Sequence, residues 1–228
     1  MPFLFYDPTM ILLIPAIILA IWAQSLVKST FAKYQKVSAS TGMSGAEVAR
    51  RLLEASGLGS VSIEEVEGKL SDHYDPRSRT LRLSQNVARS RTVAAISVAA
   101  HEVGHAIQHQ KAWSPFRLRQ SIFPAANIGS RLAFPLFIGG LFFAYEPLMD
   151  IGILLFSAAV AFQVVTLPVE FNASKRALAM LSTRGYLVQQ ETGQARKVLR
   201  AAALTYVAST AVAVLHLLRL LILRGARD

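Results

Sequence analysis

Four long apolar stretches are the feature that most constrains this chain of 228 residues. Each approaches or exceeds the roughly 20 residues with which an α-helix crosses the hydrocarbon core of a bilayer. Because 53% of the chain is hydrophobic, a wholly water-soluble fold is difficult to reconcile with it. We predict a mainly α, polytopic membrane protein with about four transmembrane helices and a small α+β cytoplasmic part. The apolar stretches are Met10–Val27, Ile122–Tyr145, Leu148–Leu167 and Ala201–Leu223.

The four stretches differ in how clearly they predict a membrane span. The first has no charged residue and is followed by basic residues, which favours an uncleaved anchor over a signal peptide. The second and third are separated only by Glu146 and its neighbours, so they predict a hairpin. Arg131 lies within the second stretch, and an arginine is costly there unless the span begins near Ser130. The fourth contains His216 and Arg219, so it either spans the membrane or lies at its interface.

The distribution of charge predicts the orientation in a bacterial-type plasma membrane. Residues 28–121 hold 14 of the 24 basic residues and residues 169–200 hold six, whereas the first ten residues and the hairpin hold none. Lys and Arg are retained on the cytoplasmic side of short connections. Both basic connections are therefore expected in the cytoplasm, with the amino terminus and the hairpin outside. Arg224 and Arg227 fit this rule poorly if the last stretch spans.

Two classes of chemistry are disfavoured by composition. The net charge of +10 follows from the basic connections, and no stacking aromatics are interleaved with the basic residues, so we expect no nucleic-acid partner. Cysteine is absent, which excludes thiolate ligands and a cysteine nucleophile. A metal site would need His, Asp or Glu side chains.

Between the first and second stretches the pattern mixes helix and strand. Residues 44–56 predict a short amphipathic helix with Ser44 as N-cap and Glu47 completing a capping box. Two alternating segments, Val61–Val66 and Thr80–Ser84, predict strands on either side of a turn at Ser71–Pro76. From about Thr92 to Lys111 the chain is rich in alanine and predicts a helix.

The motif His101-Glu102-Val103-Gly104-His105 lies within this last helix. Residues four apart share one helical face, so both imidazoles can reach a single metal ion, while Glu102 can lean toward its open side. The composition gives an expectation of roughly 0.004 such motifs by chance. We therefore predict one Zn²⁺ ion, with Glu102 as the general base for the water that it activates. The alternative is an ordinary helix whose histidines face solvent or are hydrogen-bonded within the core.

A third ligand is needed, and Glu170 is the candidate. It follows the third apolar stretch directly, at a predicted helix start marked by Pro168. The hairpin returns the chain to the side from which His101 and His105 emerge. Complementation of a helix dipole is the alternative explanation for this carboxylate, and His109 or Asp72 would be the substitute ligand.

Four segments together resemble the YugP-like family of membrane zinc metallopeptidases, distant relatives of HtpX-like and CAAX-prenyl-protease-like gluzincins. The resemblance covers nearly the whole chain. It implies a zincin-like metallopeptidase domain in which His101, His105 and Glu170 bind the metal and Glu102 is catalytic. The segments are Ser71–Pro76, Val98–Gln108, Ser114–Arg119 and Leu167–Phe171.

The chain departs from these relatives around Glu170. HtpX-type chains carry an aspartate four residues after the ligand glutamate, where this chain has Ser174. Asn172 also stands where YugP-like chains often have aspartate. The sequence therefore does not predict which groups orient the two histidines.

The three other histidines are expected to have roles other than metal binding. His109 lies one turn beyond His105 and is expected at the surface or behind the ligands. His73 is expected to make a hydrogen bond in its turn, although it could also reach a substrate carbonyl. His216 is expected at the membrane interface.

We expect a membrane zinc endopeptidase that cleaves a peptide or membrane-protein substrate on the cytoplasmic side. The predicted strand next to the Ser71–Pro76 segment would accept an extended substrate by pairing along its edge. The alternative is an inactive zinc-containing binding or assembly factor; a transporter lacks paired intramembrane charges and repeated halves. The sequence says nothing of oligomeric state.

The expected parts are an anchor (1–28), the α+β part (29–121) with the motif helix (92–111), the hairpin (122–168), a cytoplasmic helix (169–200) and a last transmembrane or interfacial helix (201–228).

Overall fold

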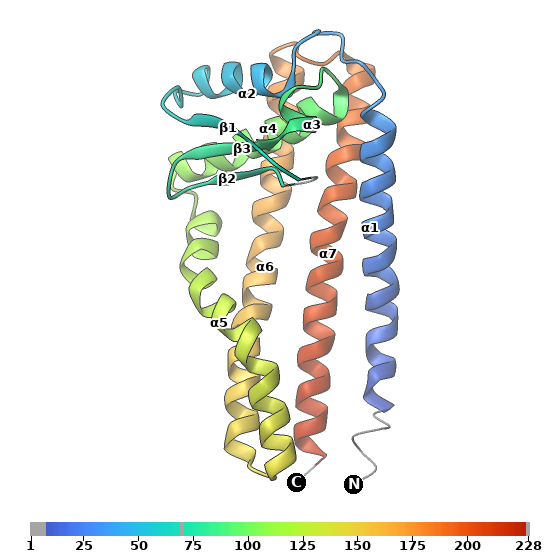
Figure 1. Ribbon diagram of the computed structural model, residues 1–228, viewed down its shortest axis with the longest axis vertical. Helices are drawn as coiled ribbons and strands as arrows, with labels where there is room; N and C mark the ends of the chain where they lie inside the picture. The colour runs from blue at the N-terminus through green and yellow to red at the C-terminus, as the bar shows by residue number, and fades with distance from the viewer. Residues whose placement is uncertain (1–7, 69–70, 227–228) are drawn as a thin grey trace. The chain divides into compact units, whose positions relative to one another are not determined.

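The computed structural model describes residues 8–68 and 71–226 and is mainly helical (Figure 1). The chain divides into two compact units. We call the first the helical unit; its described residues are Pro8–Gln24, Arg117–Leu167 and Thr205–Ala226. We call the second the mixed unit; it comprises Ser25–Phe116 and Pro168–Leu204.

The elements follow one another along the chain with one sheet inserted between the second and third α-helices. In chain order they are η1 (Pro8–Leu13), α1 (Ile14–Tyr34), α2 (Gly45–Glu54), β1 (Ser62–Val66), β2 (His73–Asp75), β3 (Thr80–Ser84), α3 (Gln85–Ala88), α4 (Val93–Gln110), α5 (Ser114–Phe143), α6 (Glu146–Thr183) and α7 (Gln189–Gly225).

In the described part of the chain, four helical segments are long and apolar enough to cross a membrane, as the sequence predicts. Large apolar side chains on these helices are exposed, among them Ile18, Phe142 and Leu154. In water this exposure would be unfavourable, whereas a lipid environment solvates such side chains. The four segments are Pro8–Tyr34, Ser114–Phe143, Glu146–Thr183 and Gln189–Gly225.

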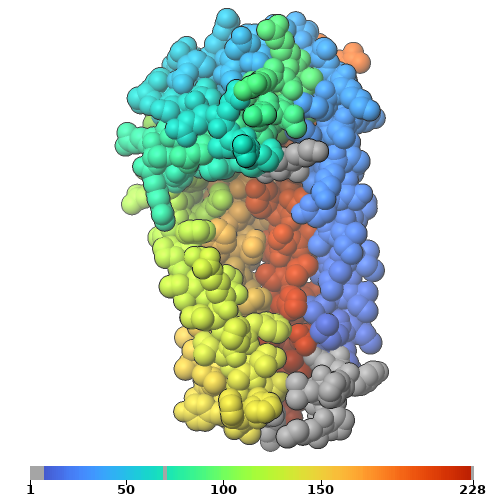
Figure 2. All heavy atoms as spheres, viewed as in Figure 1, coloured from blue at the N-terminus to red at the C-terminus, as the bar shows by residue number. Residues whose placement is uncertain are grey.

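Within the helical unit, α5 and α6 form the predicted hairpin. Ala144 takes a left-handed conformation in the turn that joins them (φ 54°). Close approach of the helices depends on small residues: a Cβ on Gly129 would lie 2.2 Å from the Leu155 carbonyl oxygen. In the space-filling view the yellow segments on either side of the turn are packed in contact (Figure 2). Arg131 lies within the continuous helix α5, with its side chain exposed.

Charged side chains near the end of α7 have partners within the helical unit. Arg224 contacts Glu146 and Asp150 at 2.8 and 2.9 Å. Arg219 donates a hydrogen bond to Thr9 Oγ1. The His216 ring lies 6.4 Å from the rings of both Phe134 and Phe156. Of the two basic residues that fit the charge rule poorly, Arg224 is therefore paired with two carboxylates, and Arg227 lies outside the described residues.

The mixed unit holds a three-stranded sheet in the order β1-β3-β2. Strand β3 pairs in parallel with β1 and antiparallel with β2 (Figure 1). The predicted capping box of α2 is present, because Ser44 and Glu47 exchange both hydrogen bonds. The prediction that Ser71–Pro76 is only a turn was wrong, since His73–Asp75 form β2. Three residues are too short a pattern to predict a strand, and the pairing with β3 decides the conformation.

Helix α4 lies at the centre of the mixed unit. Its alanine-rich faces are buried among residues of α2, β3 and α6, including Leu52, Leu81 and Ala177. Gly104 allows α6 to approach closely, since a Cβ there would lie 2.8 Å from the Ala173 carbonyl oxygen. The prediction that a helix begins at Pro168 was wrong: Pro168 lies inside α6, which runs from Glu146 to Thr183. Proline is tolerated within long apolar helices, whose freed backbone groups find other partners.

Candidate metal centre

His101 and His105 project from the same side of α4, as their spacing predicts. Their ring centroids lie 4.7 Å apart and the rings are perpendicular. Both side chains are largely withdrawn from solvent, with 12% and 10% exposed. Gly104 and the alanines of α4 leave room for this burial beside α6. The two imidazoles can therefore act together on one small ligand.

Glu170 reaches the same point from α6. Its Oε2 lies 3.1 Å from His101 Nε2 and 3.6 Å from His105 Nε2, and its side chain is 2% exposed. One ligand atom from each of the three residues lies within 4.8 Å of the others, and they form the one such group found among the described residues. Dipole complementation no longer explains Glu170, because it lies inside a helix.

The donor set suits a divalent metal ion of borderline character. Two imidazoles and one carboxylate would leave one position of a tetrahedral zinc site free for another ligand. Both Nε2 atoms face the same carboxylate oxygen, while both Nδ1 atoms contact other groups. That division of the nitrogens is the one expected when Nε2 is the ligand atom.

The groups behind the histidines are neutral. Ser174 Oγ lies 3.2 Å from His101 Nδ1, so this serine contacts His101 from the position where the sequence analysis noted an aspartate in HtpX-type chains. Gln108 Oε1 lies 3.0 Å from His105 Nδ1. Asn172 instead accepts hydrogen bonds from Gln108 and Arg176. Sequence reasoning missed Gln108, although its position three residues after His105 on a helix was a usable signal.

Glu102 lies beside this group and is itself buried. Its Oε2 accepts a 3.0 Å hydrogen bond from the backbone N–H of Tyr74 in β2. Burial raises the pKa of Glu102 to about 7; the charges of Glu170 and Asp72 act in the same direction, against His101 and the Tyr74 N–H. A carboxyl group with such a pKa can both accept and release a proton near neutrality.

The remaining candidates have other partners. His73 is exposed, and its Nδ1 lies 2.8 Å from the Ser71 carbonyl oxygen, in line with a locally bonded histidine. His109 Nδ1 lies 2.9 Å from the Tyr74 hydroxyl, and Asp72 accepts hydrogen bonds from Ser84. Neither His109 nor Asp72, the two substitute ligands, belongs to the three-residue group.

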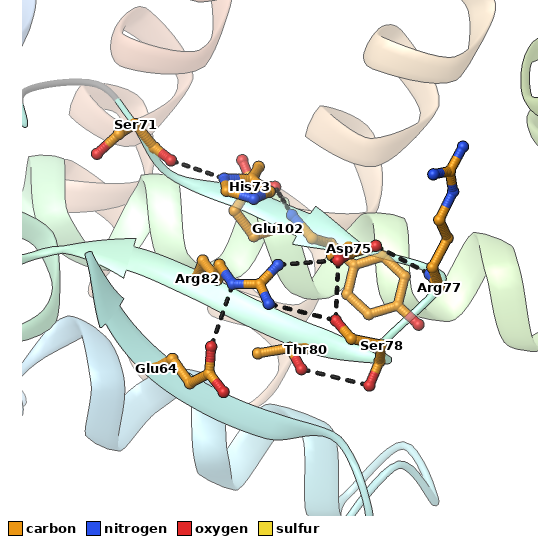
Figure 3. Close-up of polar contacts among 10 residues, drawn as sticks. Glu64, Ser71, His73, Asp75, Arg77, Ser78, Thr80, Arg82 and Glu102 are labelled. Carbon is orange, nitrogen blue, oxygen red and sulfur yellow. Dashed lines mark hydrogen bonds and ion pairs between the residues drawn. The ribbon is translucent and has the colours of Figure 1, made fainter. Parts of the chain in front are cut away.

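The exposed side of the sheet carries its own ionic network. Arg82 of β3 bridges Glu64 on β1 and Asp75 on β2 (Figure 3). The Arg82 guanidinium and further hydrogen bonds hold the pKa of Asp75 well below its usual range. This network ties β2, the strand that contacts Glu102, to the rest of the sheet.

His101, His105 and Glu170 thus form a buried, helix-borne group of two imidazoles and one carboxylate that could hold a metal ion. Residues 9–225 match the family model described as "Putative neutral zinc metallopeptidase". The chain is also 51% identical to "Putative membrane protease YugP" of Bacillus subtilis (strain 168), over 95% of this chain and 97% of that protein. The chain therefore belongs to this zinc metallopeptidase family. No solved structure gives a significant match.

Proposed function

We propose that the protein is a membrane-embedded, zinc-dependent metalloendopeptidase of the gluzincin type. The convergence of His101, His105 and Glu170 beside a buried glutamate carries this proposal. These three residues would hold one Zn²⁺ ion. Bound zinc supplies Lewis acidity for the attack of water on a peptide carbonyl.

Glu102 is the proposed general base. It is buried, its charge interacts with those of His101 and Glu170, and its pKa of about 7 allows it to take a proton from the attacking water. The same carboxyl group then returns the proton to the leaving amine. Tyr74 N–H fixes one oxygen of Glu102, which restricts the orientation of the base.

Strand β2 is the proposed docking edge for the substrate. It is the outer strand of the sheet next to β3, and its Tyr74 N–H faces Glu102. Because the Tyr74 N–H is already donated to Glu102, an extended peptide would add to this edge through the other backbone groups that face away from β3. A peptide or a membrane protein with an unfolded segment would satisfy this requirement.

The sequence supports a location for this activity. The basic connections on either side of the hairpin favour placing the mixed unit in the cytoplasm and the amino terminus outside. A relative named as a membrane protease and four apolar helices support a multi-pass membrane protein. Labelling of single cysteines introduced at Ser78 and Asp150 by a membrane-impermeant reagent would test this topology.

The decisive experiment compares Glu102→Gln with Glu54→Gln, which changes an exposed carboxylate of α2. We expect Glu102→Gln to retain zinc at one ion per chain and to lose at least about 100-fold in cleavage of fluorogenic peptides by the purified full chain. His101→Ala should lose both zinc and cleavage, and Glu54→Gln neither. A Glu102→Gln protein as active as wild type would refute the mechanism. Zinc binding without cleavage of any peptide would favour the assembly factor.

A further inference from the structure

Gln108 is a fully buried polar residue that contacts both helices of the metal centre. It is 0% exposed. Its Oε1 lies 3.0 Å from His105 Nδ1. Its Nε2 donates hydrogen bonds to the Val169 carbonyl oxygen at 2.8 Å and to Asn172 Oδ1 at 3.0 Å. The residue thus joins a histidine of α4 to the residues on either side of Glu170 in α6.

The orientation of the Gln108 amide follows from its partners. A backbone carbonyl can only accept a hydrogen bond, so Val169 requires the Nε2 end of Gln108 to face it. Asn172 adds a second constraint, because Arg176 Nε donates to its Oδ1 at 2.7 Å and arginine can only donate. Asn172 therefore presents an acceptor to Gln108. A flipped Gln108 amide would place oxygen against two acceptors.

The fixed amide determines the hydrogen position on His105. Since Oε1 of Gln108 can only accept, Nδ1 of His105 must carry the hydrogen that it donates. The Nε2 lone pair of a neutral His105 is then left facing Glu170. His101 differs in this respect, because the Ser174 hydroxyl can donate or accept and imposes no such choice.

We propose that Gln108, held by Val169 and by Asn172 with Arg176, is the positioning residue that sets the His105 tautomer for metal binding. The same amide keeps α4 and α6 in register, so that His105 and Glu170 meet. This role rests on the zinc site of the proposed function. It assigns to a neutral amide the task that a carboxylate or a backbone carbonyl performs behind many metal-bound histidines.

The test is the zinc affinity of Gln108→Met, which keeps length and apolar volume but removes the amide. Gln110→Met is the matched control, because Gln110 lies on the same helix, is exposed and donates only a weak hydrogen bond to the Gly57 carbonyl. Competition with a chelator should show about 10- to 100-fold weaker zinc binding for Gln108→Met. Gln110→Met should bind as wild type does. Thermal unfolding of the chelator-treated proteins measures any purely structural loss.

The outcomes separate the role of Gln108 from the zinc site itself. Wild-type protein that binds no zinc would overturn the proposed function and this role with it. Wild-type affinity in Gln108→Met, with or without a lower melting temperature, would overturn the positioning role alone. If Gln108→Met does not fold, Asn172→Ala decides, because it removes one of the two acceptors that hold the amide and leaves Gln108 itself in place. Zinc binding weakened by about threefold or more would support the role, and unchanged binding would overturn it.

Discussion

The two units of the molecule differ in which side chains they bury and which they expose. The mixed unit buries Glu102, His105, Gln108 and Glu170 among aliphatic residues, and each of these polar side chains contacts another polar group. The helical unit exposes many of its large apolar side chains and has a small buried cluster around Phe137. All three residues of the candidate metal site lie in the mixed unit. Burial and hydrogen bonding shift the pKa of a polar group and fix its orientation. An apolar surface, by contrast, is favourable in contact with lipid.

Both units nevertheless pack helices through glycine. Gly104 faces Ala173 in the mixed unit, and Gly129 faces Leu155 in the helical unit. An added methyl group would meet backbone atoms in both places, and backbone cannot move aside as a flexible side chain does. The two contacts differ in their relation to the candidate metal site. Gly104 sets the approach of α4, which carries His105, to α6, which carries Glu170, and Gly129 does not.

The largest effect is therefore expected from Gly104→Ala. Separation of α4 from α6 should lower the free energy of unfolding by about 3 kcal/mol. It should also weaken zinc binding by moving His105 away from Glu170. Isothermal titration with zinc and thermal melting of the purified full chain would measure the two effects.

Gly129→Ala is the matched control for Gly104→Ala. We expect it to lower the melting temperature while zinc affinity stays at the wild-type value. If Gly129→Ala weakened zinc binding as much as Gly104→Ala, the metal centre would depend on the packing of the helical unit, and the division between the units would fail.

The next effect, which concerns stability alone, is expected from Glu102→Gln in the zinc-free protein. The pKa of Glu102 is raised from 4.5 to about 7 in the folded state, chiefly by burial. Below pH 4.5 both states are protonated, and between pH 4.5 and 7 the unfolded state loses its proton first. The wild-type protein therefore loses stability over this interval and the amide variant does not.

Above pH 7 the stability difference should be constant, having grown by about 3 kcal/mol in favour of Glu102→Gln since pH 4.5. Urea unfolding at pH 4.5 and pH 8 in the presence of a chelator would measure it, with Glu54→Gln as the control. A difference that does not grow with pH would mean that Glu102 is not desolvated.

The smallest effect is expected at the ionic contacts of the helical unit. Arg224 is paired with Glu146 and Asp150, whose side chains are 51% and 57% exposed. Exposed ion pairs contribute little, so Asp150→Asn should change the free energy of unfolding by less than about 1 kcal/mol. Zinc content should remain unchanged. A loss of several kcal/mol in a denaturant titration would show that polar contacts also hold this unit together.

The sequence predicted the elements whose patterns are long or chemically specific. The apolar stretches gave four membrane-length helices because such runs are readable without knowledge of any partner. The i, i+4 spacing placed His101 and His105 on one face of α4 because helical geometry is local. The hairpin argument also anticipated that Glu170 would return to these histidines.

Other features depended on contacts between distant segments. The strand β2 exists because β3 pairs with it, and Pro168 lies inside α6 instead of starting a helix. The role of Ser174 could not be read from its departure from related chains, since only the fold shows that its hydroxyl reaches His101.

By itself, the sequence determined the shared helical face of the two histidines and the apolar helices, because histidine spacing and hydropathy act over a few residues. The tertiary structure decided the state of each group at the centre. It buried Glu102 against Tyr74 N–H, which raises the pKa of the carboxyl group, and it directed the Gln108 amide toward His105. Desolvation and hydrogen-bond direction depend on residues 28 to 64 positions away along the chain, and folding alone brings these residues together.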